Sequence, residues 1–194
     1  SIYLPSTLEK VGGNITLGSE NLESISVDKN NKYFATDVNA LVRLSDKCLL
    51  IGCSNTIIPD YTEIIYNEAF RNKKTITEID IPNSVKKIEE GAFANCISLK
   101  NINISKDSQL ETIAPSAFGN CKSVEYIYLP KTVKSIGCSF THCDELENVE
   151  FGGTSNEFIV ATYGDAFAPF RDSYYPTLLK MNITCTDIVL STGY

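Results

Sequence analysis

Three of the seven cysteines recur at one position of a repeated pattern, three residues after a phenylalanine: Cys96, Cys121 and Cys143. If the repeats stack as parallel strands, neighbouring thiols lie about 4.8 Å apart, and such a column suggests metal or redox chemistry. The same position also suits a small, weakly polar buried side chain, and free cysteine is one. We therefore expect these three cysteines to be reduced, buried and unreactive, with no metal between them.

The single histidine, His142, lies between Cys138 and Cys143, and this run could suggest zinc or a Cys/His nucleophile. Structural zinc needs four convergent ligands, and no fourth ligand is evident beside these three residues. A nucleophilic cysteine needs a base and an orienting group in a cleft, and nothing at these positions indicates a cleft. We expect no catalytic residue, no metal site and no cofactor, and the chain is predicted not to be an enzyme.

Two tyrosines, Tyr126 and Tyr128, stand where the side chains of a predicted strand point away from the core. Aligned repeats give one outward row of Ser24, Glu78, Asn101, Tyr126 and Asn148, and a second row of Ser26, Asp80, Asn103, Tyr128 and Glu150. Tyrosine is enriched at binding hot spots, and it also has a high strand propensity on a solvated sheet. Both interpretations stay open for each tyrosine.

The candidate partner-binding face consists of Tyr126, Tyr128, Asn101, Asn103, Asp80, Glu78, Asn148 and Glu150. We expect Glu150 and Asn103 to flank Tyr128 on the two neighbouring rungs. Aromatic rings beside fixed polar groups suit a protein or carbohydrate ligand. The acidic bias of the face argues against polyanions and mildly for a basic or carbohydrate partner.

These positions follow from a repeat that runs through most of the chain. Phenylalanines preceded by Ala or Ser recur at positions 70, 93, 118 and 140, in steps of 23, 25 and 22 residues. The alternation of apolar residues in Leu99–Ile104 is typical of a strand. A rung of this length buries its apolar residues only against neighbouring rungs, so the sequence predicts a solenoid with one continuous core. The four phenylalanines should form one buried column.

The composition narrows the classes of function. The chain has 194 residues, 43% of them hydrophobic and 21% charged, which is enough for one core. Seventeen Lys and Arg against 24 Asp and Glu give a net charge of -7. Without a basic block, we expect no nucleic-acid partner. No apolar stretch approaches the ~18 residues of a membrane helix, so no direct membrane insertion is expected. Without an initiator Met or a signal peptide, the chain is expected to be a piece of a longer protein.

The copy at Ile79–Leu99 reads I-x-I-P-x-S-V-x-x-I-x-x-x-A-F-x-x-C-x-x-L and resembles the BspA-like leucine-rich repeat family. The A-F-x-x-C half distinguishes this class from ordinary leucine-rich repeats. The segment Asn21–Asp28 is similar to the family's strand before a hairpin insertion, whose strands would be Ala40–Leu44 and Cys48–Gly52. The tail from Phe151 resembles the family's closing module, with Phe158 where a tryptophan is usual.

The expected fold class is an α/β repeat, a leucine-rich repeat solenoid of about six rungs of 22–25 residues. The chain is predicted to be a single domain. It would comprise partial first rungs (1–27), a β-hairpin insertion (28–56), four regular rungs (57–150) and a C-terminal cap (151–194).

The resemblance implies a secreted or surface-attached bacterial protein of adhesion or host-interaction type, and it identifies neither a ligand nor a catalytic residue. We therefore expect a non-catalytic module that binds a protein or a glycan. A structural spacer within a larger surface protein is the alternative, and an enzyme based on Cys and His is disfavoured. The oligomeric state is left open.

Overall fold

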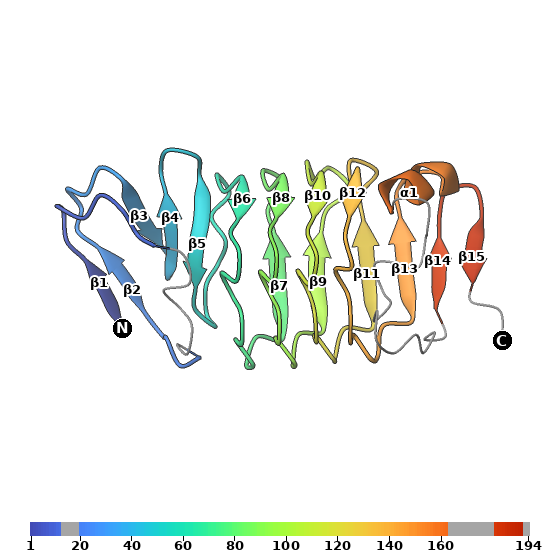
Figure 1. Ribbon diagram of the computed structural model, residues 1–194, viewed down its shortest axis with the longest axis horizontal. Helices are drawn as coiled ribbons and strands as arrows, with labels where there is room; N and C mark the ends of the chain where they lie inside the picture. Colours follow the sequence, from blue (N-terminus) through green and yellow to red (C-terminus); the bar gives the residue numbers. More distant parts are fainter. Residues whose placement is uncertain (13–19, 163–180, 192–194) are drawn as a thin grey trace.

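Successive rungs of the chain lie side by side along one axis and form an elongated solenoid of about six turns (Figure 1). The computed structural model describes residues 1–12, 20–162 and 181–191. Each regular rung consists of a long strand, a turn, a short strand and a side built from turns. The inward apolar side chains of neighbouring rungs cover one another, and one core therefore runs through the stack.

The long strands pair in parallel and present one outer face of the solenoid. They are β7 (Glu78–Ile81) with β9 (Asn101–Ile104), and β11 (Tyr126–Leu129) with β13 (Asn148–Phe151) and β14 (Asn182–Thr184). Because successive side chains of a strand point to opposite faces, exposed and buried residues alternate along them. Ile102 and Ile104 are buried, and the alternation predicted for this strand is confirmed.

The short strands form a second parallel ladder above the long ones in Figure 1. They are β6 (Ile64–Ile65), β8 (Lys87–Ile88), β10 (Thr112–Ile113) and β12 (Ser135–Ile136). Each places one isoleucine in the core, and Ile65, Ile88, Ile113 and Ile136 are all buried. Two such ladders on different sides of the rung fix its cross-section and hold the long strands in register.

The predicted hairpin is confirmed, because β4 (Ala40–Arg43) and β5 (Cys48–Gly52) pair antiparallel. A further strand that the sequence did not indicate, β3 (Phe34–Asp37), pairs antiparallel with β4. The insertion is therefore a three-stranded meander. Its last strand, β5, also pairs in parallel with β6 and so begins the ladder of short strands.

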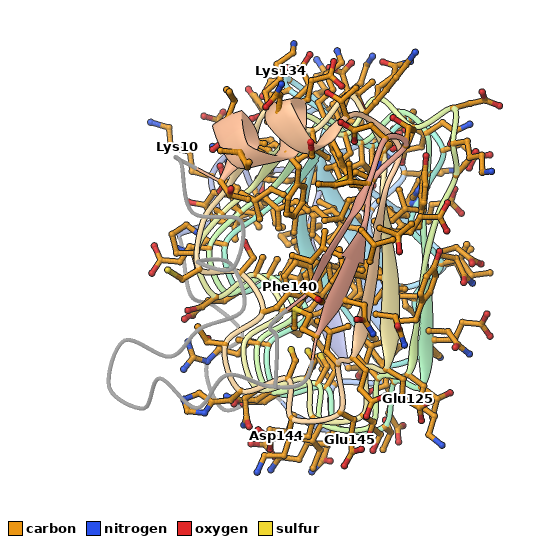
Figure 2. All side chains as sticks on the ribbon, turned by 90° about the vertical axis from the view of Figure 1, so that its right-hand side faces the viewer. Lys10, Glu125, Lys134, Phe140, Asp144 and Glu145 are labelled. Carbon is orange, nitrogen blue, oxygen red and sulfur yellow. The ribbon has the colours of Figure 1, made fainter. Side chains whose placement is uncertain are left out.

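Four phenylalanine rings form one buried column through the solenoid: Phe70, Phe93, Phe118 and Phe140. Consecutive ring centroids are 4.9, 5.1 and 5.2 Å apart, and the rings lie within 10° of parallel. Figure 2, which looks along the solenoid, shows Phe140 inside the cross-section. The predicted column is confirmed.

Both ends of the solenoid depart from the regular rung. At the N-terminal end, β1 (Ile2–Leu4) pairs in parallel with β2 (Ile25–Val27). At the C-terminal end, β15 (Val189–Ser191) pairs antiparallel with β14. The helix α1 (Ser155–Ala161) begins at a capping box, in which Thr154 and Glu157 exchange hydrogen bonds. Much of the predicted cap falls on residues 163–180, which lie outside the described residues.

The expected α/β class needs correction, because the described residues are mostly β with one helix. The turn side of each rung cannot continue as a helix, since residues with left-handed backbone interrupt it. In one rung these residues are Gly91 and Asn95, with φ of 62° and 63°. Glu68, Asn72, Ser116 and Asn120 repeat the same two positions in the neighbouring rungs.

Candidate functional site

The outer face of the long strands contains a shallow hollow of about 560 Å³ beside the two predicted tyrosines. Its lining includes Asp80, Asn103, Lys106, Tyr126, Tyr128 and Glu150. Strands β7, β9, β11 and β13 each contribute side chains, because their register places Asp80 beside Asn103 and Tyr128 beside Glu150. We call Glu78, Asp80, Asn103, Tyr126, Tyr128 and Glu150 the tyrosine patch.

Tyr126 is held in place by its neighbour across the strands although 47% of the residue is exposed. Its hydroxyl donates a hydrogen bond of 2.8 Å to Oε2 of Glu150. Partial burial and this bond to a carboxylate raise the pKa of Tyr126 to about 12. The phenol therefore stays protonated at neutral pH and keeps its donor on Glu150.

Tyr128 is half-buried, and its ring lies over a glycine that follows the next strand. A Cβ atom at Gly152 would come within 2.4 Å of the Tyr128 hydroxyl oxygen, so that any other residue there would displace the ring. Burial and the charge of Glu150 raise the pKa of Tyr128. Sequence reasoning did not include Gly152 in the site, although the Gly-Gly pair directly after β13 was the available signal.

Asn103 connects two carboxylates of the neighbouring rung. Its Nδ2 atom donates one hydrogen bond of 2.7 Å to Oε1 of Glu78 and another of 2.7 Å to Oδ1 of Asp80. An amide nitrogen carries two hydrogens, and both are used here. The side chain therefore orders Glu78 and Asp80, and it has no hydrogen left for a ligand.

Five of the eight predicted residues line the hollow. A sixth, Glu78, is connected to them through Asn103, and the other two lie beside them. Asn101 and Asn148 are exposed, lie beside Glu78 and Tyr126 in register, and do not line the hollow. Ser26 was aligned with the row of Asp80, but it pairs with Tyr3 in the separate β1–β2 sheet. The copy between β2 and β7 forms no long strand, and the row therefore does not extend to the N-terminal end.

The three repeated cysteines are buried, as predicted, and form a hydrogen-bonded column. The Sγ atoms of Cys96, Cys121 and Cys143 each donate to the carbonyl oxygen of the phenylalanine one rung earlier, at 3.2 Å. Burial raises the pKa of Cys96 and of Cys143 to about 12. All seven cysteines are free thiols. This column packs the core and leaves little thiolate for chemistry.

Lys73 occupies the cysteine position of the preceding rung, three residues after Phe70, and is 1% exposed. Burial lowers the pKa of Lys73. Sequence reasoning missed this buried lysine. Its spacing from Phe70 equals that of the cysteines from their phenylalanines, and this spacing was the signal that could have identified it.

Cys138 and His142 are both exposed, whereas Cys143 is turned into the core. His142 has a left-handed backbone with φ of 57° and follows Asn72, Asn95 and Asn120 at the same rung position. Those asparagines form a ladder, with Nδ2 to Oδ1 distances of 2.9 and 2.7 Å. Within the described parts of the chain, no three His, Cys, Asp or Glu side chains gather closely enough to hold a metal.

A family model described as BspA type Leucine rich repeat region matches residues 49–166 in six copies. No curated protein matches the chain. No described helix is both long and apolar enough to span a membrane.

Three solved structures share the fold. The pneumococcal vaccine antigen PcpA has a TM-score of 0.69 and 22% identity over 78% of this chain and 38% of its own. A leucine-rich cell surface protein from Faecalibacterium prausnitzii has a TM-score of 0.65 and 22% identity over 84% and 50%. A leucine-rich repeat protein from Eubacterium ventriosum has a TM-score of 0.58 and 17% identity over 94% and 56%. The chain thus spans from about two fifths to just over half of the length of these proteins.

Proposed function

Because the chain belongs to the BspA-type leucine-rich repeat family, we propose that it is a non-catalytic binding module of a secreted or surface-attached bacterial protein. The module recognises another macromolecule, a protein or a glycan, through the tyrosine patch. Its role in the parent protein is adhesion or interaction with a host. The names of two relatives with this fold, a cell surface protein and a vaccine antigen, support that location.

The observation that carries the proposal is the hollow on the long-strand face with two tyrosines in it. The rest of the described core is filled by aromatic and aliphatic columns, and such columns stabilise the fold without offering a surface. Solenoids bind partners on extended faces of this kind. Tyrosine supplies large contact area together with a polar end, which explains its frequency at interfaces.

The proposal that the chain is non-catalytic rests on the pKa values and hydrogen bonds of its buried cysteine thiols. The thiols of the cysteine column have raised pKa values and donate to backbone carbonyls. A catalytic cysteine needs a low pKa and an adjacent base, whereas burial raises the pKa of the thiols in the cysteine column.

Binding to a panel of purified extracellular proteins and immobilised glycans, measured by surface plasmon resonance, tests the proposal. We expect the unaltered protein to bind at least one member, and the double variant Tyr126→Ser/Tyr128→Ser to lose that binding at a nearly unchanged melting temperature. The matched control is Tyr33→Ser/Tyr61→Ser, which removes two tyrosines of similar exposure, 43% and 39%, outside the patch.

Equal binding by the patch variant and the unaltered protein would exclude the tyrosine patch as the site. Absence of binding to every member of the panel would favour the alternative function, a structural spacer within a larger surface protein. A large loss of stability in the patch variant would show that the two rings support the fold rather than a partner.

A further inference from the structure

The hydrogen-bond donors of the tyrosine patch are largely used within the protein, whereas its acceptors remain free. The Tyr126 hydroxyl donates to Oε2 of Glu150, and both amide hydrogens of Asn103 go to Glu78 and Asp80. The second oxygen of each of these carboxylates receives no hydrogen bond from the described residues. Among the side chains that line the hollow, the hydroxyls of Tyr128 and Ser105 and the Lys106 ammonium remain as donors. A ligand that fits this surface must itself be rich in donors.

The two outer faces of the solenoid differ in how many of their carboxylates are paired with lysine. On the short-strand side the acidic side chains have lysine partners at 2.7–3.0 Å: Glu63 with Lys47 and Lys86, Glu89 with Lys87, and Glu111 with Lys134. On the long-strand face, five carboxylates form no ion pair with any described residue: Glu78, Asp80, Glu125, Glu147 and Glu150. Lys106 lines the hollow, and the exposed Lys100 directly precedes β9. Figure 2 shows Lys134 beside helix α1 and Glu125 on the side of the long strands.

The two tyrosines add aromatic faces to this uncompensated negative charge. Tyr126 and Tyr128 are two residues apart on β11 and point to the same side of the sheet. A cation above a tyrosine ring is attracted by the ring's quadrupole. Guanidinium stacks on aromatic rings and matches carboxylate oxygens with its planar fork, whereas ammonium does neither.

We propose that the tyrosine patch binds an arginine side chain that another protein presents on an extended segment. The guanidinium stacks on the Tyr128 ring and donates to the free oxygen of Glu150, the neighbour of Tyr128 in register. Asp80, two strands away on the other side of Tyr128, adds negative charge to the site. The segment continues across the strands over the exposed amides of Asn101 and Asn148. This inference rests on the proposed function and specifies its partner. A neutral glycan fits less well, because its hydroxyl groups need donors as well as acceptors.

Titration of the ¹⁵N-labelled full chain with tetra-arginine amide, followed by amide chemical shifts, tests the inference. The probes for comparison are tetra-citrulline amide, whose side chains have nearly the same shape without charge, tetra-lysine amide and a neutral chito-oligosaccharide. We expect saturable shifts centred on β9, β11 and β13 with the arginine peptide, a dissociation constant at least tenfold weaker with citrulline, and several-fold weaker with lysine.

The variants separate a specific site from general attraction to an acidic protein. Asp80→Asn/Glu150→Gln should weaken the arginine peptide at least tenfold. The control Glu9→Gln/Glu90→Gln removes two charges from exposed residues outside the patch and should change binding less than twofold. Equal weakening by both pairs would overturn the inference, as would shifts spread over the whole surface.

The outcomes also distinguish this inference from the proposed function. Shifts at the patch with the chito-oligosaccharide, and none with the arginine peptide, would overturn the arginine partner and leave the binding module standing. Equal affinity for the citrulline and arginine peptides would likewise overturn it. The absence of any saturable shift with the arginine peptide would refute the inference whatever the panel of extracellular proteins shows.

Discussion

Each side chain of the regular rungs is constrained by its equivalents in the rungs before and after it, because the same position recurs about 4.8 Å away. The cysteine position shows this most clearly, since the thiols of Cys96 and Cys121 donate to backbone carbonyls in the same manner. Where one rung carries a different residue, the neighbours show what the position requires. Lys73 among cysteines and Thr62 among valines are two such exceptions.

The thiols of the cysteine column should not react with thiol reagents in the folded protein. A pKa of about 12 for Cys96 and Cys143 leaves almost no thiolate at pH 8, and burial excludes reagents. With a thiol-reactive disulfide reagent we expect Cys138, which is exposed, to react within minutes. The three column thiols should react only in denaturant.

The variant Cys138→Ser is the control, because it should remove the fast phase of the thiol titration. Rapid labelling of Cys96, Cys121 or Cys143 in the native protein, located by mass spectrometry, would contradict the prediction. Stoichiometric zinc in the purified protein, or a disulfide between two of these thiols, would contradict it as well.

Replacing Thr62 by valine should stabilise the protein. Thr62 is fully buried and its hydroxyl has no hydrogen-bond partner among the described residues, and the same rung position holds the buried Val85 and Val133. Removing an unsatisfied buried hydroxyl relieves its desolvation cost, so we expect Thr62→Val to raise the free energy of unfolding by about 1 kcal/mol. Urea denaturation followed by circular dichroism measures the change.

Thr132→Val is the matched control for this substitution. The Thr132 hydroxyl donates to the carbonyl oxygen of Ser108 at 3.0 Å, and its replacement should lower the urea midpoint or leave it unchanged. A lower midpoint for Thr62→Val than for the unaltered protein would show that the Thr62 hydroxyl is satisfied in solution.

At the scale of the elements, ion pairs connect the short strands of neighbouring rungs. The carboxylate of Glu63, next to β6, accepts from Lys47 at 2.7 Å and from Lys86 at 2.8 Å. These two hydrogen bonds, together with the charges of the lysines, lower the pKa of Glu63 to about 2. One carboxylate therefore connects the ends of β5, β6 and β8.

The stabilisation by Glu63 should depend on pH in a known direction. Its pKa in the folded state lies below the ordinary value, so its contribution is complete above pH 4.5 and is lost as the pH falls towards 2. We expect Glu63→Gln to lower the urea midpoint slightly at pH 7 and to have no effect near pH 2. The effect is small because exposed ion pairs are screened by water and salt.

Glu90→Gln is the control for this prediction, because Glu90 is exposed and forms no ion pair with a described residue. Its midpoint should differ less from that of the unaltered protein at pH 7. A difference between Glu63→Gln and the unaltered protein that persists or grows on acidification would argue against the assigned role of Glu63.

The long strands were predictable because their own residues alternate between apolar and polar, as in Leu99–Ile104. The hairpin was predictable only through the resemblance to the family, because β4 and β5 are buried almost throughout and show no such alternation. The short strands were not, because a two-residue strand such as Ile64–Ile65 is defined by hydrogen bonds from the neighbouring rungs. In the candidate site the sequence predicted which side chains share a face. It could not show that Asn103 and Tyr126 use their donors within the protein, since this depends on rotamers and on the register between strands.

For the whole molecule, the most consequential feature is that the meander of β3–β5 lies between two parts of the core. Along these strands, side chains such as Val42 and Leu49 pack into the main core, whereas Leu41 and Ile51 pack with Phe34 in a smaller N-terminal cluster. An array in which each rung contacts only its neighbours transmits a local defect weakly. The two clusters should therefore open with different free energies.

Replacing Phe93 by alanine should weaken the main core and spare the N-terminal cluster. Phe93 is fully buried between Phe70 and Phe118, and its truncation leaves a cavity that costs ~3–5 kcal/mol. Native-state hydrogen exchange should show this loss in the amides of β8–β11, with β1 and β2 nearly unchanged, because exchange reports local opening. The reciprocal variant Phe34→Ala truncates a buried ring of the smaller cluster and should reverse the pattern. An equal loss of protection in both clusters for either variant would mean that the chain opens as one cooperative unit and that the meander couples the two parts of the core.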